Sequence, residues 1–199
     1  MSEPSYPAPR DPADLGFEAI VYEKAPPRAT ITLNRPEVLN AFDFRMLREI
    51  ARAAEDASWD DSIRVVVVTG AGRAFCVGAD LKAWSRDYLG KPDEYWKWFG
   101  AFKDAHDKLR EIGKPTLARI NGLCVGGGNE LQMACDLSVI VGDTYIRHVG
   151  PQHGSVPAGG ATQWLPIMVG ERRAREIILL CEEVPAAKAE EWGLVNRCV

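Results

Sequence analysis

The chain has 199 residues, of which 46% are hydrophobic, and this is enough to bury the core of one domain. Its 24 Lys and Arg residues are outnumbered by 28 Asp and Glu residues, so the charge balance argues against binding to a nucleic-acid backbone. No apolar run approaches the roughly 20 residues that a membrane-spanning helix needs, which argues against insertion into a membrane.

The first residues and the cysteines indicate the compartment. Residues 1–16 contain several prolines and no apolar signal-peptide core, so an extended N-terminal tail is predicted there. The five cysteines form no Cys-x-x-Cys pair and lie in apolar contexts: Cys76, Cys124, Cys135, Cys181 and Cys198. This odd, unpaired set favours buried thiols in a reducing cytoplasm, and no zinc or iron–sulfur spacing predicts a metal site.

Predicted strands and helices alternate from residue 17 onward. Strands are predicted at residues 19–23, 28–34, 63–70, 115–121 and 137–141, and residues 193–199 are typical of one more. Helices are predicted at residues 42–57, 92–112 and 129–135, then in two or three pieces from Gly160, with a last one starting near Pro185. The β-branched run 63–70 is typical of a central parallel strand buried on both faces. The pattern predicts an α/β fold in a single domain, residues 17–199.

Two glycine-containing loops follow predicted strands. In residues 74–81, Gly78 permits an unusual turn and Asp80 suits the N-cap of a helix starting near Leu81, with the Ala79 amide ahead of it. In residues 125–131, three glycines precede a helix whose N-terminal amides favour negative charge. Either loop alone is equally well explained as a flexible turn or an ordinary cap. Together they predict two amides that converge on one carbonyl oxygen, an oxyanion hole.

These segments resemble the crotonase (enoyl-CoA hydratase/isomerase) superfamily. The resemblance is carried by residues 33–42, 74–81, 120–122, 126–128, 130–131 and 134–136, in the order and spacing of the family. It implies a spiral of ββα units, an acyl-CoA thioester as substrate and no cofactor beyond that coenzyme A. It also implies a homotrimer or hexamer, and a C-terminal helical segment that the sequence as given does not contain.

The resemblance assigns roles to particular residues. The amides of Ala79 and Gly127 correspond to the oxyanion hole, and Glu130 corresponds to one of the two catalytic glutamates of the hydratases. Contacts with substrate and coenzyme A fall on residues that flank these amides: Ala41, Gly78, Ala79, Asp80, Leu81, Lys82, Gly126 and Gly127. Glu130 is expected in the first turn of its helix, where the helix dipole favours the ionised carboxylate of a base.

One segment departs from the hydratase pattern. Gly150 stands where the second glutamate is expected, and residues 150–155 resemble the naphthoate synthase and 6-oxocyclohexene-carbonyl-CoA hydrolase branches. The aspartate of the naphthoate synthases falls on Pro157. His148 and His153 flank the departure and are candidates for acid/base chemistry, although a lone histidine is more often structural. His106, among charged neighbours, is predicted to lie on the surface.

Aromatic residues crowd the predicted helix 92–112. Tyr95, Trp96, Trp98, Phe99 and Phe102 are explained by core or subunit packing, or alternatively by an aromatic wall around a bulky or cyclic acyl group.

Three functional hypotheses follow. The first is an enolate-forming acyl-CoA enzyme of the enoyl-CoA hydratase/isomerase type, a lyase such as those of fatty acid metabolism. The second is a hydrolase or cyclase of a cyclic oxoacyl-CoA. The third is a non-catalytic protein that binds CoA esters.

Overall fold

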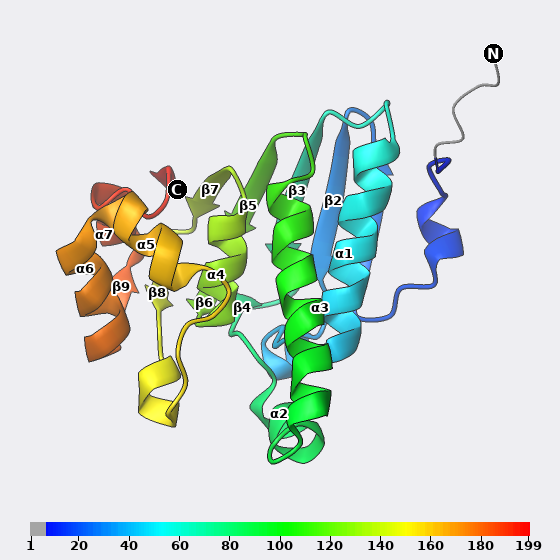
Figure 1. The fold of residues 1–199 in the computed structure, drawn as a ribbon. Coiled ribbons are helices and arrows are strands. Elements are labelled where there is room, and N and C mark those ends of the chain that lie inside the picture. The colour runs from blue at the N-terminus through cyan, green and yellow to red at the C-terminus, as the bar shows by residue number, and fades with distance from the viewer. Residues whose placement is uncertain (1–6) are drawn as a thin grey trace.

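The computed structural model describes residues 7–199, so the part of the predicted tail at residues 1–6 lies outside the described residues. Two sheets organise the chain (Figure 1). The larger sheet contains, in spatial order, β1 (Ile20–Ala25), β2 (Arg28–Leu33), β3 (Val65–Gly70), β5 (Thr116–Ile120), β7 (Leu137–Ile140) and β10 (Arg197–Cys198). Only the β1–β2 pair of this sheet is antiparallel.

The smaller sheet lies where the parallel strands of the larger one end. It contains, in order, β4 (Ala74–Cys76), β6 (Leu123–Val125), β8 (Tyr145–Arg147) and β9 (Val184–Pro185). β4, β6 and β8 run parallel, and β9 pairs with β8 in the opposite direction. Three times the chain passes through the large sheet, then the small sheet, then into a helix, which gives the expected ββα repetition.

Helices cover the large sheet and extend beyond it. The α-helices are α1 (Phe44–Trp59), α2 (Leu81–Asp87), α3 (Pro92–Arg110), α4 (Gly127–Ala134), α5 (Ala161–Val169), α6 (Glu171–Arg175) and α7 (Ala186–Glu191). Short 3-10 turns occur at η1 (Pro12–Leu15), η2 (Pro36–Val38) and η3 (Gly150–His153), and a π turn, η4 (Glu176–Leu180), continues α6. α1 and α3 lie side by side over one face of the large sheet (Figure 1).

The core lies between this helix pair and the sheet. α1 begins because the carboxylate of Asp43 accepts a hydrogen bond from the Met46 amide at 2.8 Å. Its inner face buries Leu47 and Ile50 completely against the strands, where Ile31 is also fully buried. β3 pairs in parallel with β2 and β5, so the prediction of a central parallel strand is confirmed.

The α/β class and the main elements agree with the sequence prediction, with two differences. The small sheet was not predicted, because strands of two or three residues show no alternation. Within residues 7–16, Pro12–Leu15 form a 3-10 turn and Leu15 is buried, where an extended tail was expected. No helix within residues 7–199 is both long and apolar enough to cross a membrane. Four of the cysteines are buried thiols, and Cys198 is half-buried.

Candidate functional site

Two parallel neighbours in the small sheet bring the glycine loops together. The first loop leaves β4 at Val77 and the second leaves β6 at Gly126, so both start at the same edge of the sheet. The loops approach so closely that a Cβ added to Gly78 would lie 2.9 Å from the Gly127 nitrogen. Gly78 also has φ of +89°, a conformation that side chains disfavour. Glycine is therefore required there on two grounds.

A cavity of about 490 Å³ opens beside these loops. It is lined by residues of both loops, by the aromatic face of α3 and by the segment that follows β8: Val77, Gly78, Ala79, Leu81, Trp84, Tyr95, Trp98, Phe99, Phe102, Gly126, Gly127, Glu130, His148, Val149, Gly150, His153, Gly154, Ser155, Val156, Pro157 and Ala158. Most of the predicted site residues therefore meet in one place. The exceptions are Ala41, Asp80 and Lys82, which do not line the cavity.

The first loop is fixed to the segment that precedes α1. The Phe42 amide donates to the Gly78 carbonyl at 2.7 Å, and the Phe42 carbonyl accepts the Asp80 amide at 2.9 Å. These two bonds form a parallel β-bridge between Phe42 and Ala79. This bridge uses the backbone groups of Gly78 and Asp80. The Ala79 amide donates to no acceptor within residues 7–199, and the same is true of the Gly127 amide.

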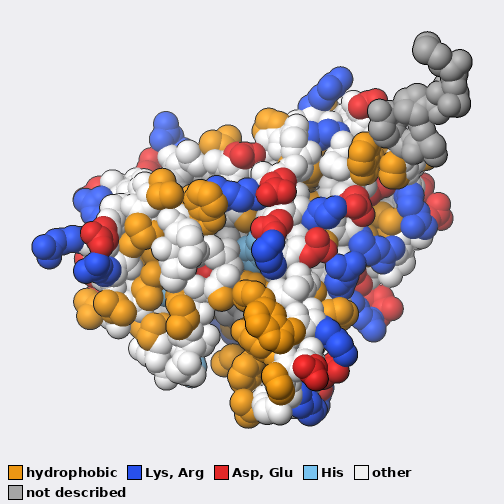
Figure 2. All heavy atoms as spheres, in the orientation of Figure 1, with side chains coloured by type: hydrophobic (Ala, Val, Ile, Leu, Met, Phe, Trp, Pro, Cys, Tyr) orange, Lys and Arg blue, Asp and Glu red, His pale blue; other side chains and the backbone are white. Residues whose placement is uncertain are grey.

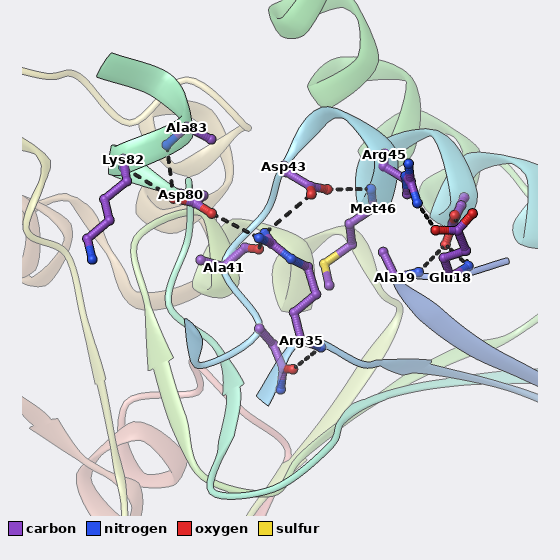
Figure 3. A network of polar contacts seen from close by, with 12 residues as sticks. Glu18, Ala19, Arg35, Ala41, Asp43, Arg45, Met46, Asp80, Lys82 and Ala83 are labelled. Atoms are coloured by element: carbon purple, nitrogen blue, oxygen red, sulfur yellow. Dashed lines mark hydrogen bonds and ion pairs between the residues drawn. The ribbon is translucent and has the colours of Figure 1, made fainter. Parts of the chain in front are cut away.

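Arg35 ties the same segments through its side chain (Figure 3). Its guanidinium donates to the Ala41 carbonyl at 2.7 Å and to the Asp80 carboxylate at 3.0 Å, and lies 3.5 Å from Asp43. Asp80 caps α2 as predicted, accepting the Lys82 and Ala83 amides. Burial opposes ionisation of Asp80, but the Ala83 amide and Arg35 outweigh it and lower the pKa of Asp80. Ala41 and Asp80 therefore hold the loop in place from behind the cavity, and sequence reasoning missed Arg35.

Glu130 lies in the first turn of α4 as predicted, and it is only 4% exposed. Its Oε1 accepts the amides of Gly159 at 2.7 Å and Ala161 at 3.1 Å, whereas Oε2 has no hydrogen-bond partner within the described chain. Burial raises the pKa of Glu130 to about 7, and the two amides offset only part of that effect. The helix dipole was expected to favour the ionised carboxylate, but burial has the larger effect and the pKa is raised. A carboxyl with this pKa both accepts and returns a proton near neutral pH.

His148 follows β8 and is 1% exposed although it contributes to the cavity lining. Its Nε2 lies 2.8 Å from the Asn129 side-chain nitrogen, and the Asn129 oxygen accepts Gln132 at 2.9 Å. Burial lowers the pKa of His148 to about 4, so the ring is neutral at pH 7. His153 also lines the cavity, but it lies exposed in η3 and makes no hydrogen bond through its side chain within residues 7–199.

His106 is buried, so its prediction as a surface residue is wrong. It is 5% exposed and its ring centre lies 4.3 Å from that of Phe102. Nδ1 lies 2.7 Å from the Phe102 carbonyl, which only accepts, while Nε2 has no partner among the described residues. Burial lowers the pKa of His106 to about 4, so this ring is a neutral part of the core.

The aromatic residues of α3 serve both packing and the cavity. Trp98 and Phe102 are buried, stack with ring centres 5.3 Å apart and line the cavity together with Tyr95 and Phe99. Trp96 is 66% exposed and lies outside the lining. A Cβ added to Gly159 would lie 2.7 Å from Phe102 and 3.0 Å from Glu130 Oε2, so the aromatic wall reaches the carboxyl.

Hydrophobic side chains also gather on the surface over α2 and the adjoining end of α3 (Figure 2). Leu81 and Leu89 are both more than half exposed in this region. A second hollow, of about 510 Å³, lies between the outer faces of α1 and α3. Lys108 and Glu55 form an ion pair in its lining, and it contains none of the predicted site residues.

Comparison with known proteins agrees with this arrangement. The sequence profile of the family described as enoyl-CoA hydratase/isomerase matches residues 28–199. The 6-oxocyclohex-1-ene-1-carbonyl-CoA hydrolase of Geobacter metallireducens is 38% identical over 168 residues, which are 84% of this chain and 44% of that protein. The protein of the same name from Thauera aromatica is 33% identical over 193 residues, 90% of this chain and 51% of that one. The chain thus spans about half the length of the curated relatives it matches.

Solved structures show the same fold. The crystal structure of an enoyl-CoA hydratase from Bacillus anthracis has a TM-score of 0.86 and 30% sequence identity to this chain. The match covers 92% of this chain and 70% of the hydratase. The predicted crotonase-like fold is therefore confirmed.

Proposed function

The chain belongs to the enoyl-CoA hydratase/isomerase family, and we propose that it binds an acyl-CoA thioester and stabilises its enolate. The amides of Ala79 and Gly127 donate to the thioester oxygen as negative charge develops on it. Coenzyme A enters as part of the substrate, and no other cofactor takes part. The observation that supports this most strongly is the buried carboxyl of Glu130, with a pKa of about 7, in a cavity whose lining also includes Ala79 and Gly127.

A single carboxyl suffices to add water across a double bond conjugated to the thioester. Ionised Glu130 takes a proton from water while the oxygen bonds to the β-carbon, and the π electrons move onto the thioester oxygen. Protonated Glu130 then returns that proton to the α-carbon, so the atoms and charge balance. Glu130 Oε2 has no protein partner among residues 7–199 and is free for this exchange. Gly150 in place of a second carboxyl therefore does not prevent the reaction.

The acyl group is proposed to be a ring that carries an oxo group, on which the enzyme acts as a hydrolase. After the first water has added to the double bond, a second water adds its oxygen to the oxo carbon, and the bond from that carbon to the carbon bearing the thioester breaks. The oxo carbon becomes a carboxyl group, and a proton from that water goes to the other carbon. The wall of Tyr95, Trp98, Phe99 and Phe102 supports a flat or cyclic group. The names of the two curated relatives describe a six-membered ring of this kind. The second candidate is hydration or isomerisation of a linear enoyl-CoA, which the likeness to solved enoyl-CoA hydratases supports. A homotrimer or hexamer and a cytoplasmic location are proposed from the family, and light scattering in solution tests the former.

The test compares two substitutions of buried glutamates with each other. Glu130→Gln removes the proton-transferring group while keeping its shape. Glu49→Gln is the matched control, because Glu49 is also buried and accepts backbone amides, such as Ala19 at 2.8 Å, but lies outside the cavity. Turnover of crotonyl-CoA and of 6-oxocyclohex-1-ene-1-carbonyl-CoA is measured by absorbance and by product analysis.

We expect Glu130→Gln to lower kcat by about a hundredfold or more, and Glu49→Gln to change it by less than about threefold. Preference for the cyclic ester supports the hydrolase proposal, whereas turnover of crotonyl-CoA alone favours the hydratase. Unchanged turnover in Glu130→Gln would contradict the mechanism. Binding of both CoA esters with no turnover of either would instead favour the third hypothesis, a non-catalytic protein.

A further inference from the structure

His148 is a buried histidine that lines the cavity. One of its ring nitrogens, Nε2, lies next to Asn129, and the other, Nδ1, has no hydrogen-bond partner among residues 7–199. Asn129 Nδ2 lies 2.8 Å from Nε2, and Gln132 Nε2 donates to Asn129 Oδ1 at 2.9 Å. Because the Asn129 oxygen accepts from Gln132, its nitrogen is the group that faces the imidazole, and it donates to Nε2. Nε2 therefore carries no proton, which leaves the proton of the neutral ring on Nδ1.

The surroundings keep this ring neutral. The side chain is 1% exposed, and among residues 7–199 it makes no ion pair or hydrogen bond with an acidic group. Burial alone lowers the pKa of His148 to about 4. The side chains of Asn129 and Gln132 are themselves no more than 2% exposed, so the contacts that orient the ring are shielded from water.

We propose that His148 donates a hydrogen bond from Nδ1 to a second oxygen of the acyl group, the ring oxo group of a cyclic oxoacyl-CoA. This rests on the proposed function and assigns a residue to the recognition of that oxygen. His148 is then a fixed donor, and it differs from the acid/base histidine expected from the sequence. Asn129 and Gln132 are positioning residues, because they act through the imidazole.

The chemistry of such a substrate gives the donor a catalytic effect. In a 6-oxo ring with a 1,2 double bond, the carbon that bears the thioester lies between two carbonyl groups. Water addition at carbon 2 breaks one O–H bond, whose proton passes to ionised Glu130, forms one C–O bond and sends the π electrons into both carbonyl oxygens. The Ala79 and Gly127 amides face the thioester oxygen and His148 faces the ring oxygen, so each oxygen that gains charge has a donor.

The experiment compares a substrate that has the second oxygen with one that lacks it. The two probes are 6-oxocyclohex-1-ene-1-carbonyl-CoA and cyclohex-1-ene-1-carbonyl-CoA, tested on the wild type, His148→Ala and His148→Asn. Asparagine places an amide nitrogen close to the position of Nδ1 and is the conservative rescue variant. Each protein is assayed for kcat/KM and, by titration calorimetry, for the Kd of each ester.

We expect His148→Ala to lower kcat/KM for the oxo substrate by at least tenfold and to change it less than threefold for the other, with His148→Asn recovering part of the loss. Circular dichroism verifies that each variant folds. An equal loss for both substrates, or no loss, overturns the assignment. If the wild type turns over neither ester, the proposed function fails, but the donor role of His148 is still tested by the Kd values. A weaker Kd in His148→Ala for the oxo ester alone upholds the donor, and equal Kd changes overturn it.

Discussion

The two walls of the cavity are built differently. The amide wall comes from residues 78–79 and the segment 126–130, and its first loop is held by backbone hydrogen bonds to Phe42 and, through Asp80, by Arg35. The outer wall, residues 148–158, is mostly exposed between residues 151 and 156 and is bonded largely within itself, as in the 2.9 Å contact from the Ser155 amide to the Gly150 carbonyl. The amide wall positions the backbone amides that any enolate chemistry needs. Side chains of the outer wall can be substituted without moving those amides. Its composition is therefore the place to look for the choice of reaction.

The largest effect is expected where the amide wall has no spare room. A Cβ added to Gly128 would lie 2.1 Å from the Cys76 carbonyl oxygen, a backbone atom that moves only with β4. Gly128→Ala should destabilise the fold by about 3 kcal/mol or more, or prevent folding. Urea denaturation measures the difference in the free energy of unfolding.

Gly100→Ala is the control for that substitution. Gly100 lies in α3 with no atom within 4 Å of the added Cβ, so alanine should stabilise the helix by up to about 1 kcal/mol. Equal changes in the free energy of unfolding for the two substitutions would mean that the amide wall moves to accommodate the added Cβ. That result would contradict the rigidity attributed to this wall.

A second effect concerns the charge at the junction of the walls, where Glu130 accepts the Gly159 amide. Its pKa is raised from 4.5 to about 7, so the folded state retains a proton that the unfolded state has released. Wild-type stability should therefore fall by about 3 kcal/mol between pH 4.5 and pH 7, relative to Glu130→Gln, and then level off. Urea titrations of both proteins from pH 4.5 to pH 8 test this. A difference that is independent of pH would mean that the carboxyl keeps its ordinary pKa.

A smaller loss is expected when the support behind the amide wall is removed. Arg35→Met leaves the Asp80 carboxylate and the Ala41 carbonyl without their donor, and should cost about 1–3 kcal/mol. It should also raise the KM of a CoA ester, because the Ala79 loop loses an anchor. Arg48→Met breaks the exposed pair with Asp104 and should cost less than about 0.5 kcal/mol. Thermal unfolding of both variants provides the comparison, and a loss in Arg48→Met as large as that in Arg35→Met would contradict it.

Much of the fold was predictable because its signals are local and long. The run Val65–Gly70 is marked by its continuous β-branched residues, and the helices α1 and α3 have enough residues to show a helical period. The start of α4 at Gly127 was placed two residues too late, because glycine has a poor helix propensity. Contact between Gly128 and Cys76 overrides that propensity. Strands of two or three residues, such as β9, form only because a neighbouring strand is already in place.

Most residues of the site were predictable from the sequence, but their burial, pKa values and contacts were less so. Glu130 was found, yet its pKa depends on how deeply it is buried and on the amides of Gly159 and Ala161, which are about thirty positions away in the sequence. His106 was wrongly predicted to lie on the surface because its neighbours in the sequence are charged. Its spacing of four from Phe102 and three from Leu109 continues the inward stripe of α3, and that signal would have found it. Asn129 and Arg35 act through contacts that no local pattern reveals.

The smallest effect is expected at the exposed end of the outer wall. His153 lines the cavity, but its side chain is exposed and makes no hydrogen bond within residues 7–199, whereas His148 is held by Asn129. His153→Ala should change kcat/KM by less than about threefold, because no fixed contact is lost and water replaces the ring. The same assay with both cyclic esters measures it beside His148→Ala. A loss in His153→Ala that equals or exceeds that in His148→Ala would move the functional histidine to η3. The exposed part of the outer wall would then contribute to chemistry as directly as the amide wall does.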